Sequence, residues 1–180
     1  MYLIIAIILI VIIVVFMYNR LIRSRNLLNE AWSGIDVQLK RRHDLIPNII
    51  ETVKGYKEYE EKVLTNITSL RSKLTGTTTI QEKGQIENSF TQALKSIFAL
   101  AEAYPDLKAN QNFVELQNTL RDIEDQIQMA RRYYNGAARN YNIIVESFPG
   151  NVLARLFNFN RADFFEIEYA TEREVPDVKF

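Results

Sequence analysis

The stretch that decides the fold is residues 113–148, FVELQNTLRDIEDQIQMARRYYNGAARNYNIIVESF. Its apolar side chains recur at alternating spacings of three and four residues, which is the heptad pattern of a long packed helix. The predicted seam consists of Phe113, Leu116, Leu120, Ile123, Ile127, Ala130, Tyr134, Ala137, Tyr141, Ile144 and Phe148. The flanks are charged and predict a solvated side, formed by Arg121, Asp122, Glu124, Asp125, Arg131 and Arg132.

Shorter helices are predicted on either side of this seam. Upstream, a helix ends near Tyr104, because Pro105 disfavours helical geometry in the residue before it. The apolar face of that helix consists of Ile86, Phe90, Ala93 or Leu94, Ile97 and Leu100. Downstream, Pro149 and Gly150 end the long helix, and residues 151–157 predict a short one. Its apolar face consists of Val152, Leu153, Leu156 and Phe157.

Further towards the N-terminus, residues 28–74 keep helical spacing and predict one long amphipathic helix or two in series. Pro47 interrupts the pattern and predicts a kink within residues 42–47, because a proline inside a helix removes a backbone hydrogen bond. Alternatively, Asp44 caps a fresh helix. The threonine run with Gly76, residues 75–79, predicts a turn.

Residues 1–18, MYLIIAIILIVIIVVFMY, carry no charge. As a helix they span about 27 Å, close to the roughly 30 Å hydrocarbon core of a bilayer. They predict a transmembrane helix rather than a buried core helix, which normally shows a polar face. A cleaved signal peptide is not favoured, since no Lys or Arg precedes the run and no Ala-x-Ala site follows it. We expect an uncleaved anchor that continues into the first helix of the bundle.

The cationic residues Arg20, Arg23 and Arg25 follow the apolar run directly. By the positive-inside rule they predict a single-pass protein of the cell membrane with its C-terminal domain in the cytoplasm. They are also candidate contacts for anionic lipid headgroups. Topology alone would require the same arginines, so headgroup specificity does not follow.

The C-terminal composition changes from Asn158 onward. Phe165, Ile167 and Tyr169 alternate with acidic residues, which favours an extended segment. The predicted fold is therefore all-α: a transmembrane anchor over residues 1–18, an antiparallel bundle of long helices over residues 19–157, and an extended tail over residues 158–180.

Composition removes several function classes. The chain has no cysteine, so disulfides, thiolate ligands and cysteine nucleophiles are excluded. Its 22 basic and 22 acidic residues balance, so it lacks the positive field that phosphate backbones require, and nucleic acid is not expected as a partner.

Four blocks of sequence resemble the LemA family of bacterial membrane proteins. The most distinctive is RRHDLIPNIIETVKGY at residues 41–56, joined by AWSGIDVQL at residues 31–39, ARRYYN at residues 130–135 and VPDVKF at residues 175–180. The resemblance covers nearly the whole chain in order. It implies an N-terminal anchor, a helical bundle on the cytoplasmic side and no established enzymatic activity, and it supplies no catalytic residue.

Within that signature, Arg42, His43 and Asp44 are the first candidate site residues. His43 is the only histidine and could pair with Asp44 as a catalytic or pH-sensitive group. Neighbours in sequence point around a helix in different directions, so a solvated turn or a structural hydrogen bond near the kink is favoured. Helical bundles that hold two metal ions use Glu-x-x-His pairs, and no glutamate stands three residues before His43. We therefore assign no catalytic residue, cofactor or metal site.

Candidate interaction residues lie elsewhere in the chain. Tyr134 is expected in the packed seam, which leaves Tyr133 and Asn135 as candidate contacts to acidic lipids or to a partner's carboxylates. Val178 and Phe180 in the tail suit addition to a partner's sheet edge, although the tail could equally fold back on its own bundle.

These patterns favour a non-enzymatic, membrane-tethered scaffold. We expect it to contact the lipid bilayer, to self-associate as a homo-oligomer through helix faces and the tail, and to organise other membrane proteins. One alternative is a membrane-binding or membrane-remodelling protein whose amphipathic faces act on the bilayer. Another is a hydrolase centred on His43 and Asp44.

Overall fold

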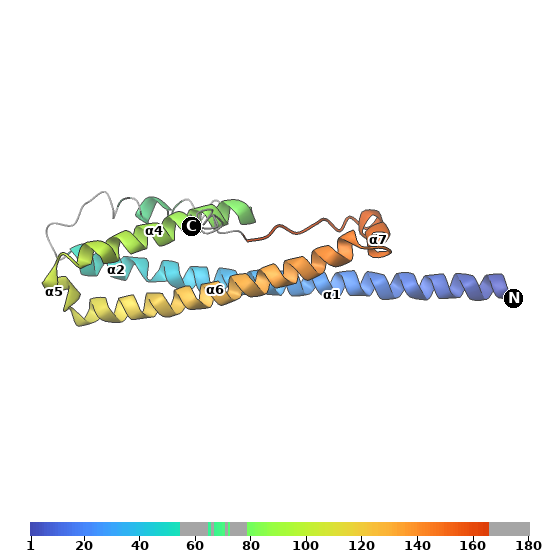
Figure 1. Cartoon of the computed structure of the whole chain (residues 1–180), viewed down its shortest axis with the longest axis horizontal. Helices are drawn as coiled ribbons and strands as arrows, with labels where there is room; N and C mark the ends of the chain where they lie inside the picture. Colours follow the sequence, from blue (N-terminus) through green and yellow to red (C-terminus); the bar gives the residue numbers. More distant parts are fainter. Residues whose placement is uncertain (55–64, 66, 71, 73–78, 166–180) are drawn as a thin grey trace, which may run out of the picture. The chain divides into compact units, whose positions relative to one another are not determined.

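The computed structural model describes residues 1–54, 65, 67–70, 72 and 79–165. The regular elements in this part of the chain are all helices, which confirms the predicted all-α class (Figure 1). The helices are α1 (Tyr2–Asp44), α2 (Ile46–Lys54), α4 (Ile80–Ala101), α5 (Pro105–Lys108), α6 (Gln111–Glu146) and α7 (Gly150–Leu156). They group into two compact units.

The first unit comprises Met1–Arg42 and Arg121–Phe164, so it pairs most of α1 with the C-terminal part of α6 (Figure 1). The contacts along this pair run in opposite directions in sequence. Arg42 contacts Glu124 and Trp32 contacts Tyr134, while Tyr18 reaches Phe157 beyond the end of α6. The two helices are therefore antiparallel, as the predicted bundle requires.

The second unit comprises His43–Leu120 together with Phe165–Phe180. Each of its described helices supplies side chains to one apolar core. Ile49 comes from α2, Phe90 from α4, Leu107 from α5 and Phe113 from α6, and all of them are buried. Phe98 and Phe113 add a ring contact with centroids 5.7 Å apart.

Local chemistry explains where the helices begin and end. The helical assignment is interrupted at Leu45, inside the predicted 42–47 kink, because Pro47 has no N–H to donate one turn back. Pro105 opens α5, and Tyr104 before it is extended. The side chain of Asn110 caps α6 by accepting hydrogen bonds from the backbone N–H groups of Asn112 and Phe113, at 3.0 and 3.3 Å.

The predicted seam of α6 is confirmed over most of its length and wrong in detail towards its C-terminal end. Tyr134 and Tyr141 are buried as expected, but Ala138 rather than Ala137 is the buried alanine, and Phe148 is exposed. Arg131, predicted on the solvated flank, is buried. The reason is that 127, 131, 134, 138 and 141 also follow spacings of four and three, so the buried stripe passes through Arg131.

The short helix predicted after Pro149 is confirmed as α7, within a residue at each end. Its predicted apolar face does not pack as a whole. Leu153 is buried, whereas Val152, Leu156 and Phe157 are exposed. Most of the predicted 75–79 turn, and residues 166–180 of the predicted tail, lie outside the described residues.

The N-terminal part of α1 presents an apolar surface with little packed against it. The helical stretch Tyr2–Lys54 contains an 18-residue window of mean hydropathy 2.9, none of which is buried. By length and composition this is the one described helix that is apolar enough to cross a membrane. An exposed apolar surface of this size is unfavourable in water, which favours lipid as its surroundings.

Candidate functional site

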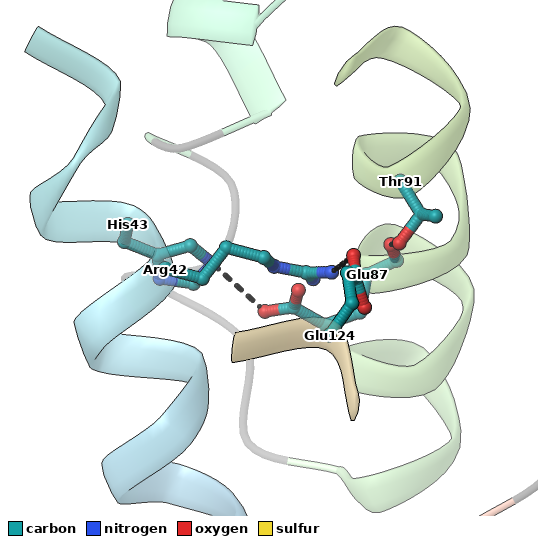
Figure 2. A network of polar contacts seen from close by, with 5 residues as sticks. All are labelled: Arg42, His43, Glu87, Thr91 and Glu124. Atoms are coloured by element: carbon teal, nitrogen blue, oxygen red, sulfur yellow. Dashed lines mark hydrogen bonds and ion pairs between the residues drawn. The ribbon is translucent and has the colours of Figure 1, made fainter. Parts of the chain in front are cut away.

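His43 contacts a buried glutamate from another helix of the second unit (Figure 2). Its Nε2 atom lies 2.9 Å from Oε1 of Glu87 on α4, and its ring meets the ring of Phe90 edge-on at 5.2 Å. Thr91 donates a hydrogen bond to the backbone carbonyl of Glu87 at 3.1 Å. The structure thus gives His43 a carboxylate partner in Glu87, while Asp44 is exposed.

Arg42 forms a separate ion pair inside the first unit. Its Nη1 atom lies 2.6 Å from Oε1 of Glu124 on α6, and its side chain is fully buried (Figure 2). Burial lowers the pKa of Arg42, and the charge and hydrogen bond of Glu124 oppose this by raising it. Since a guanidinium stays protonated in proteins, the pair is a buried salt bridge that ties α1 to α6.

The chemistry of these two pairs is structural in character. Both Arg42 and His43 direct their polar atoms at carboxylates within the fold, which is the arrangement expected of a structural contact near the kink. In the described ranges, no group of three His, Cys, Asp or Glu side chains is placed to hold a metal ion. Among the described contacts, His43 pairs with Glu87 and none joins it to Asp44, so these contacts do not support the hydrolase hypothesis.

Sequence reasoning missed two buried ionic residues, Glu87 and Arg131. A signal for Glu87 was present, since it stands three residues before Phe90 on the apolar face of α4. An acidic residue inside an apolar stripe needs a cationic or hydrogen-bonding partner from a facing helix, and His43 supplies one. The partner could not be named because it lies 44 positions away in the chain.

Side chains of α6 hold the segment that follows α7. The hydroxyl of Tyr134 donates to the carbonyl of Asp163 at 2.9 Å. Asn142 pairs with the backbone of Ala162 twice, donating to its carbonyl at 2.9 Å and accepting from its N–H at 2.8 Å. Burial, and secondarily the charge of Asp163, raise the pKa of Tyr134 to about 12. These hydrogen bonds hold the segment after α7 against α6 and stabilise the first unit.

The juxtamembrane arginines divide into two kinds. Arg20 and Arg23 are exposed on α1. Arg25 places its guanidinium carbon 4.9 Å from the centroid of the Phe159 ring, a cation–π contact within the first unit. Its charge lowers the pKa of Tyr141, which burial raises more strongly. The headgroup contacts predicted for the three arginines stay predictions.

The remaining candidates are placed as follows. Tyr133 is exposed on α6, on the side away from Tyr134, and Asn135 is half-buried. Val178 and Phe180 lie outside the described residues. The interaction roles assigned to these residues from the sequence stay predictions.

Comparison with known proteins decides the family. A LemA family model matches residues 31–180, which contain both the Arg42 and the His43 contacts. The chain belongs to the LemA family. It is 32% identical over 165 residues to protein LemA of Metamycoplasma hominis, an alignment that covers 89% of this chain and 72% of that protein.

More distant relatives are named as magnetosome proteins. The chain is 22% identical over 175 residues to magnetosome protein MamQ 2 of Paramagnetospirillum magneticum, and 20% identical over 174 residues to magnetosome protein MamQ of Magnetospirillum gryphiswaldense. These alignments cover 83% and 82% of this chain and 64% of each relative. The chain therefore spans somewhat less than two thirds of the length of either magnetosome protein.

The LemA match begins at Ala31, so it starts beyond the apolar run of α1. It includes α6 and α7, and with them the Tyr134 and Asn142 contacts. Taken with the exposed apolar part of α1, membership of the LemA family supports a membrane-associated protein. The names of these relatives state no enzymatic activity.

Proposed function

We propose that this LemA-family chain is a non-enzymatic, single-pass membrane protein whose helical domain is a scaffold at the bilayer surface. One observation carries the proposal. α1 runs as a single 43-residue helix from the exposed apolar segment into the part that packs against α6. An anchor and a domain that share one helix are coupled without a flexible linker, so the anchor would hold the domain at the membrane.

The proposed orientation places the helical domain in the cytoplasm. Its support is the group of arginines that follows the apolar run, Arg20, Arg23 and Arg25. Because the chain has no native cysteine, Val37→Cys in the exposed face of α1 gives a single reporter. A membrane-impermeant maleimide should label it only after the cells are opened. Labelling in intact cells would contradict the cytoplasmic orientation.

Self-association is supported by a second stripe on α6, on the side away from its packed seam. We call the residues Met129, Tyr133, Gly136, Asn140 and Ile143 the outer stripe of α6. Their spacings of four, three, four and three keep them on one helical face. Met129 and Ile143 are each 54% exposed and Tyr133 is 57% exposed. A Cβ added at Gly136 would meet no described atom within 4 Å, so a second helix has room to approach there.

The oligomeric state of the full chain in mild detergent tests this function. We expect a species larger than the monomer by light scattering, and Ile143→Glu together with Met129→Glu should shift it to the monomer. Val37→Glu is the matched control, because Val37 is similarly exposed but lies on α1, on the face away from its buried residues. A monomer for the native sequence would contradict the self-associating scaffold.

A second candidate function is remodelling of the bilayer by the assembled chain. The observation that favours it is the exposure of Phe148 and Leu156 around α7, next to the end of the apolar run. Electron microscopy of vesicles that carry the full chain separates the two functions. A scaffold leaves the vesicle shape unchanged, whereas a remodelling protein produces tubes or smaller vesicles as its density rises.

A further inference from the structure

α7 has one packed side and one apolar side that is exposed. Gly150, Leu153 and Ala154 are buried against the first unit. On the other side Phe148, Val152 and Leu156 are 82, 57 and 70% exposed. Val152 and Leu156 stand four residues apart in α7 and so lie on one face of it, and Phe148 is exposed in the turn that precedes this helix. We call these three residues the outer face of α7.

A capping motif ends α7 at its C-terminus and holds the helix in place. Asn158 adopts a left-handed conformation with φ of 55°. The N–H of Phe159 bonds to the carbonyl of Ala154 at 2.8 Å, which is the hydrogen bond of a Schellman motif. The turn places the buried ring of Phe159 6.1 Å from Tyr18. The outer face is therefore presented by an ordered element.

α7 lies beside the last residues of the apolar run on α1 (Figure 1). A Cβ added at Gly150 would lie 3.5 Å from Cε of Met17. The rings of Tyr18 and Phe157 meet edge-on at 4.9 Å. α7 therefore lies beside the residues at which the exposed apolar surface of α1 ends.

Basic residues predominate around this region, and Glu146 at its edge pairs with Arg161 at 3.4 Å. Neither residues 1–29 nor residues 147–161 contain Asp or Glu, although the whole chain is balanced in charge. These segments contain Arg20, Arg23, Arg25, Arg155 and Arg161. Arg20, Arg23 and Arg155 are exposed. An apolar surface bordered by cations is complementary to the boundary between acyl chains and anionic headgroups.

We propose that α7 lies in the interfacial layer of the bilayer and is a second membrane contact, with Phe148, Val152 and Leu156 in the acyl-chain boundary. The occupant of the outer face is lipid. The proposal rests on the membrane-spanning part of the proposed function, because α1 sets the depth of α7. A helix seated beside the anchor would resist tilting of the domain and would fix its rotation about the bilayer normal.

Nitroxide scanning of the full chain tests this, and the absence of native cysteine makes each label unique. Single variants Val152→Cys and Leu156→Cys report on the outer face, and Val11→Cys reports on the apolar run of α1. Val37→Cys is the control, an exposed residue of the same unit that lies about 28 Å beyond Tyr18 along α1. Each labelled chain is reconstituted into vesicles of phosphatidylcholine and phosphatidylglycerol. The rate at which the nitroxide collides with oxygen, which concentrates in lipid, is compared with the rate at which it collides with a water-soluble nickel chelate.

We expect oxygen to dominate at positions 11, 152 and 156 and the nickel chelate to dominate at position 37, so the depth parameter changes sign between the two groups. If position 11 is in lipid while 152 and 156 behave like 37, the inference is overturned and the anchor stands. If position 11 also behaves like 37, the membrane-spanning premise fails and the inference fails with it. Dipolar broadening at 156 that disappears on dilution with unlabelled chain would show a second copy on the outer face, which also overturns the inference.

Discussion

The buried ion pair of Arg42 shows how single residues constrain this fold. A fully buried guanidinium loses its hydration, and Glu124 offsets that loss at 2.6 Å. Such a pair contributes less net stability than its Coulomb energy suggests, because Arg42 must leave water completely and Glu124, which stays 29% exposed, must leave it in part. It nevertheless penalises any arrangement of α1 and α6 that would leave Arg42 without Glu124.

Glu124→Gln tests that constraint. Arg42 would keep a neutral acceptor but lose the opposing charge, so we expect a loss of about 1–3 kcal/mol in the free energy of unfolding. Denaturation of the full chain in detergent measures it. Asp125→Asn, at the exposed neighbouring position, should stay within about 0.5 kcal/mol. The double variant Arg42→Met, Glu124→Leu should recover most of the loss, because it removes both charges. An equal loss in both single variants would argue against the pair.

Tyr134 gives a pH dependence whose sign follows from its pKa. The folded pKa is raised from 10.0 to about 12, so the folded chain holds its phenolic proton longer than the unfolded chain. The contribution is fully present below pH 10 and is lost as the pH rises from about 10 to about 12. It is at most about 3 kcal/mol.

Tyr134→Phe is the matching variant. At neutral pH it loses the hydrogen bond to Asp163, which costs about 1 kcal/mol. Above pH 10 it should lose less further stability than the native chain, because Phe does not ionise. Melting temperatures of both chains between pH 9 and pH 11.5 measure the difference. Parallel curves would mean that Tyr134 does not carry this pH dependence.

At the scale of elements, the glycines of the first unit differ in whether a side chain would fit at their positions. Gly150 opens α7, where an added Cβ would lie 2.2 Å from the backbone carbonyl oxygen of Ile144. That approach leaves no room for a side chain, so glycine is required for α7 to dock. Gly34 and Gly136 lie inside long helices, and a Cβ added there would meet no described atom within 4 Å. Gly34 weakens its helix without a packing reason among the described atoms, whereas Gly136 lies in the outer stripe of α6, where we propose that a second helix packs.

Alanine substitutions at Gly150 and Gly34 test this difference. Gly150→Ala should lower the free energy of unfolding by about 1–3 kcal/mol, because its Cβ would overlap backbone and force α7 to shift. Gly34→Ala should raise it by about 0.5–1 kcal/mol through higher helix propensity. Thermal unfolding followed by circular dichroism compares the three chains. A Gly150→Ala chain as stable as the native one would contradict the close docking of α7.

Local sequence patterns predicted the helices and their boundaries, but not the contacts between helices. Periodicity located α6 and α7, and Pro47 and Pro105 marked helix boundaries, because these signals are local. Periodicity did not resolve which of Ala137 and Ala138 is buried, since both fit spacings of three and four around Tyr134. The partners of the candidate site residues were also out of reach. Which carboxylate meets His43 depends on how distant helices align, and no local pattern encodes that alignment.

At the scale of the whole molecule, α1 carries two kinds of surface along one helix. Its apolar part is exposed, and its later part is buried at intervals through Leu21, Leu28, Ile35 and Leu39. The change from one kind of surface to the other occurs at residues 17–21, where the arginines begin. In the proposed function, the apolar part of this helix lies in the bilayer and its later part belongs to the helical domain.

A charge placed in the middle of the apolar run tests this division directly. Leu9→Arg puts a guanidinium near the centre of residues 1–18, where it costs about 2.5–3.5 kcal/mol for insertion. We expect a clear fall in the fraction of chain that resists alkaline carbonate extraction from membranes. Val37→Arg carries the same charge on the same helix and should leave that fraction unchanged, because Val37 lies about 28 Å beyond Tyr18 on the exposed face. Equal extraction of both variants would mean that the apolar run is not what holds the chain in the membrane.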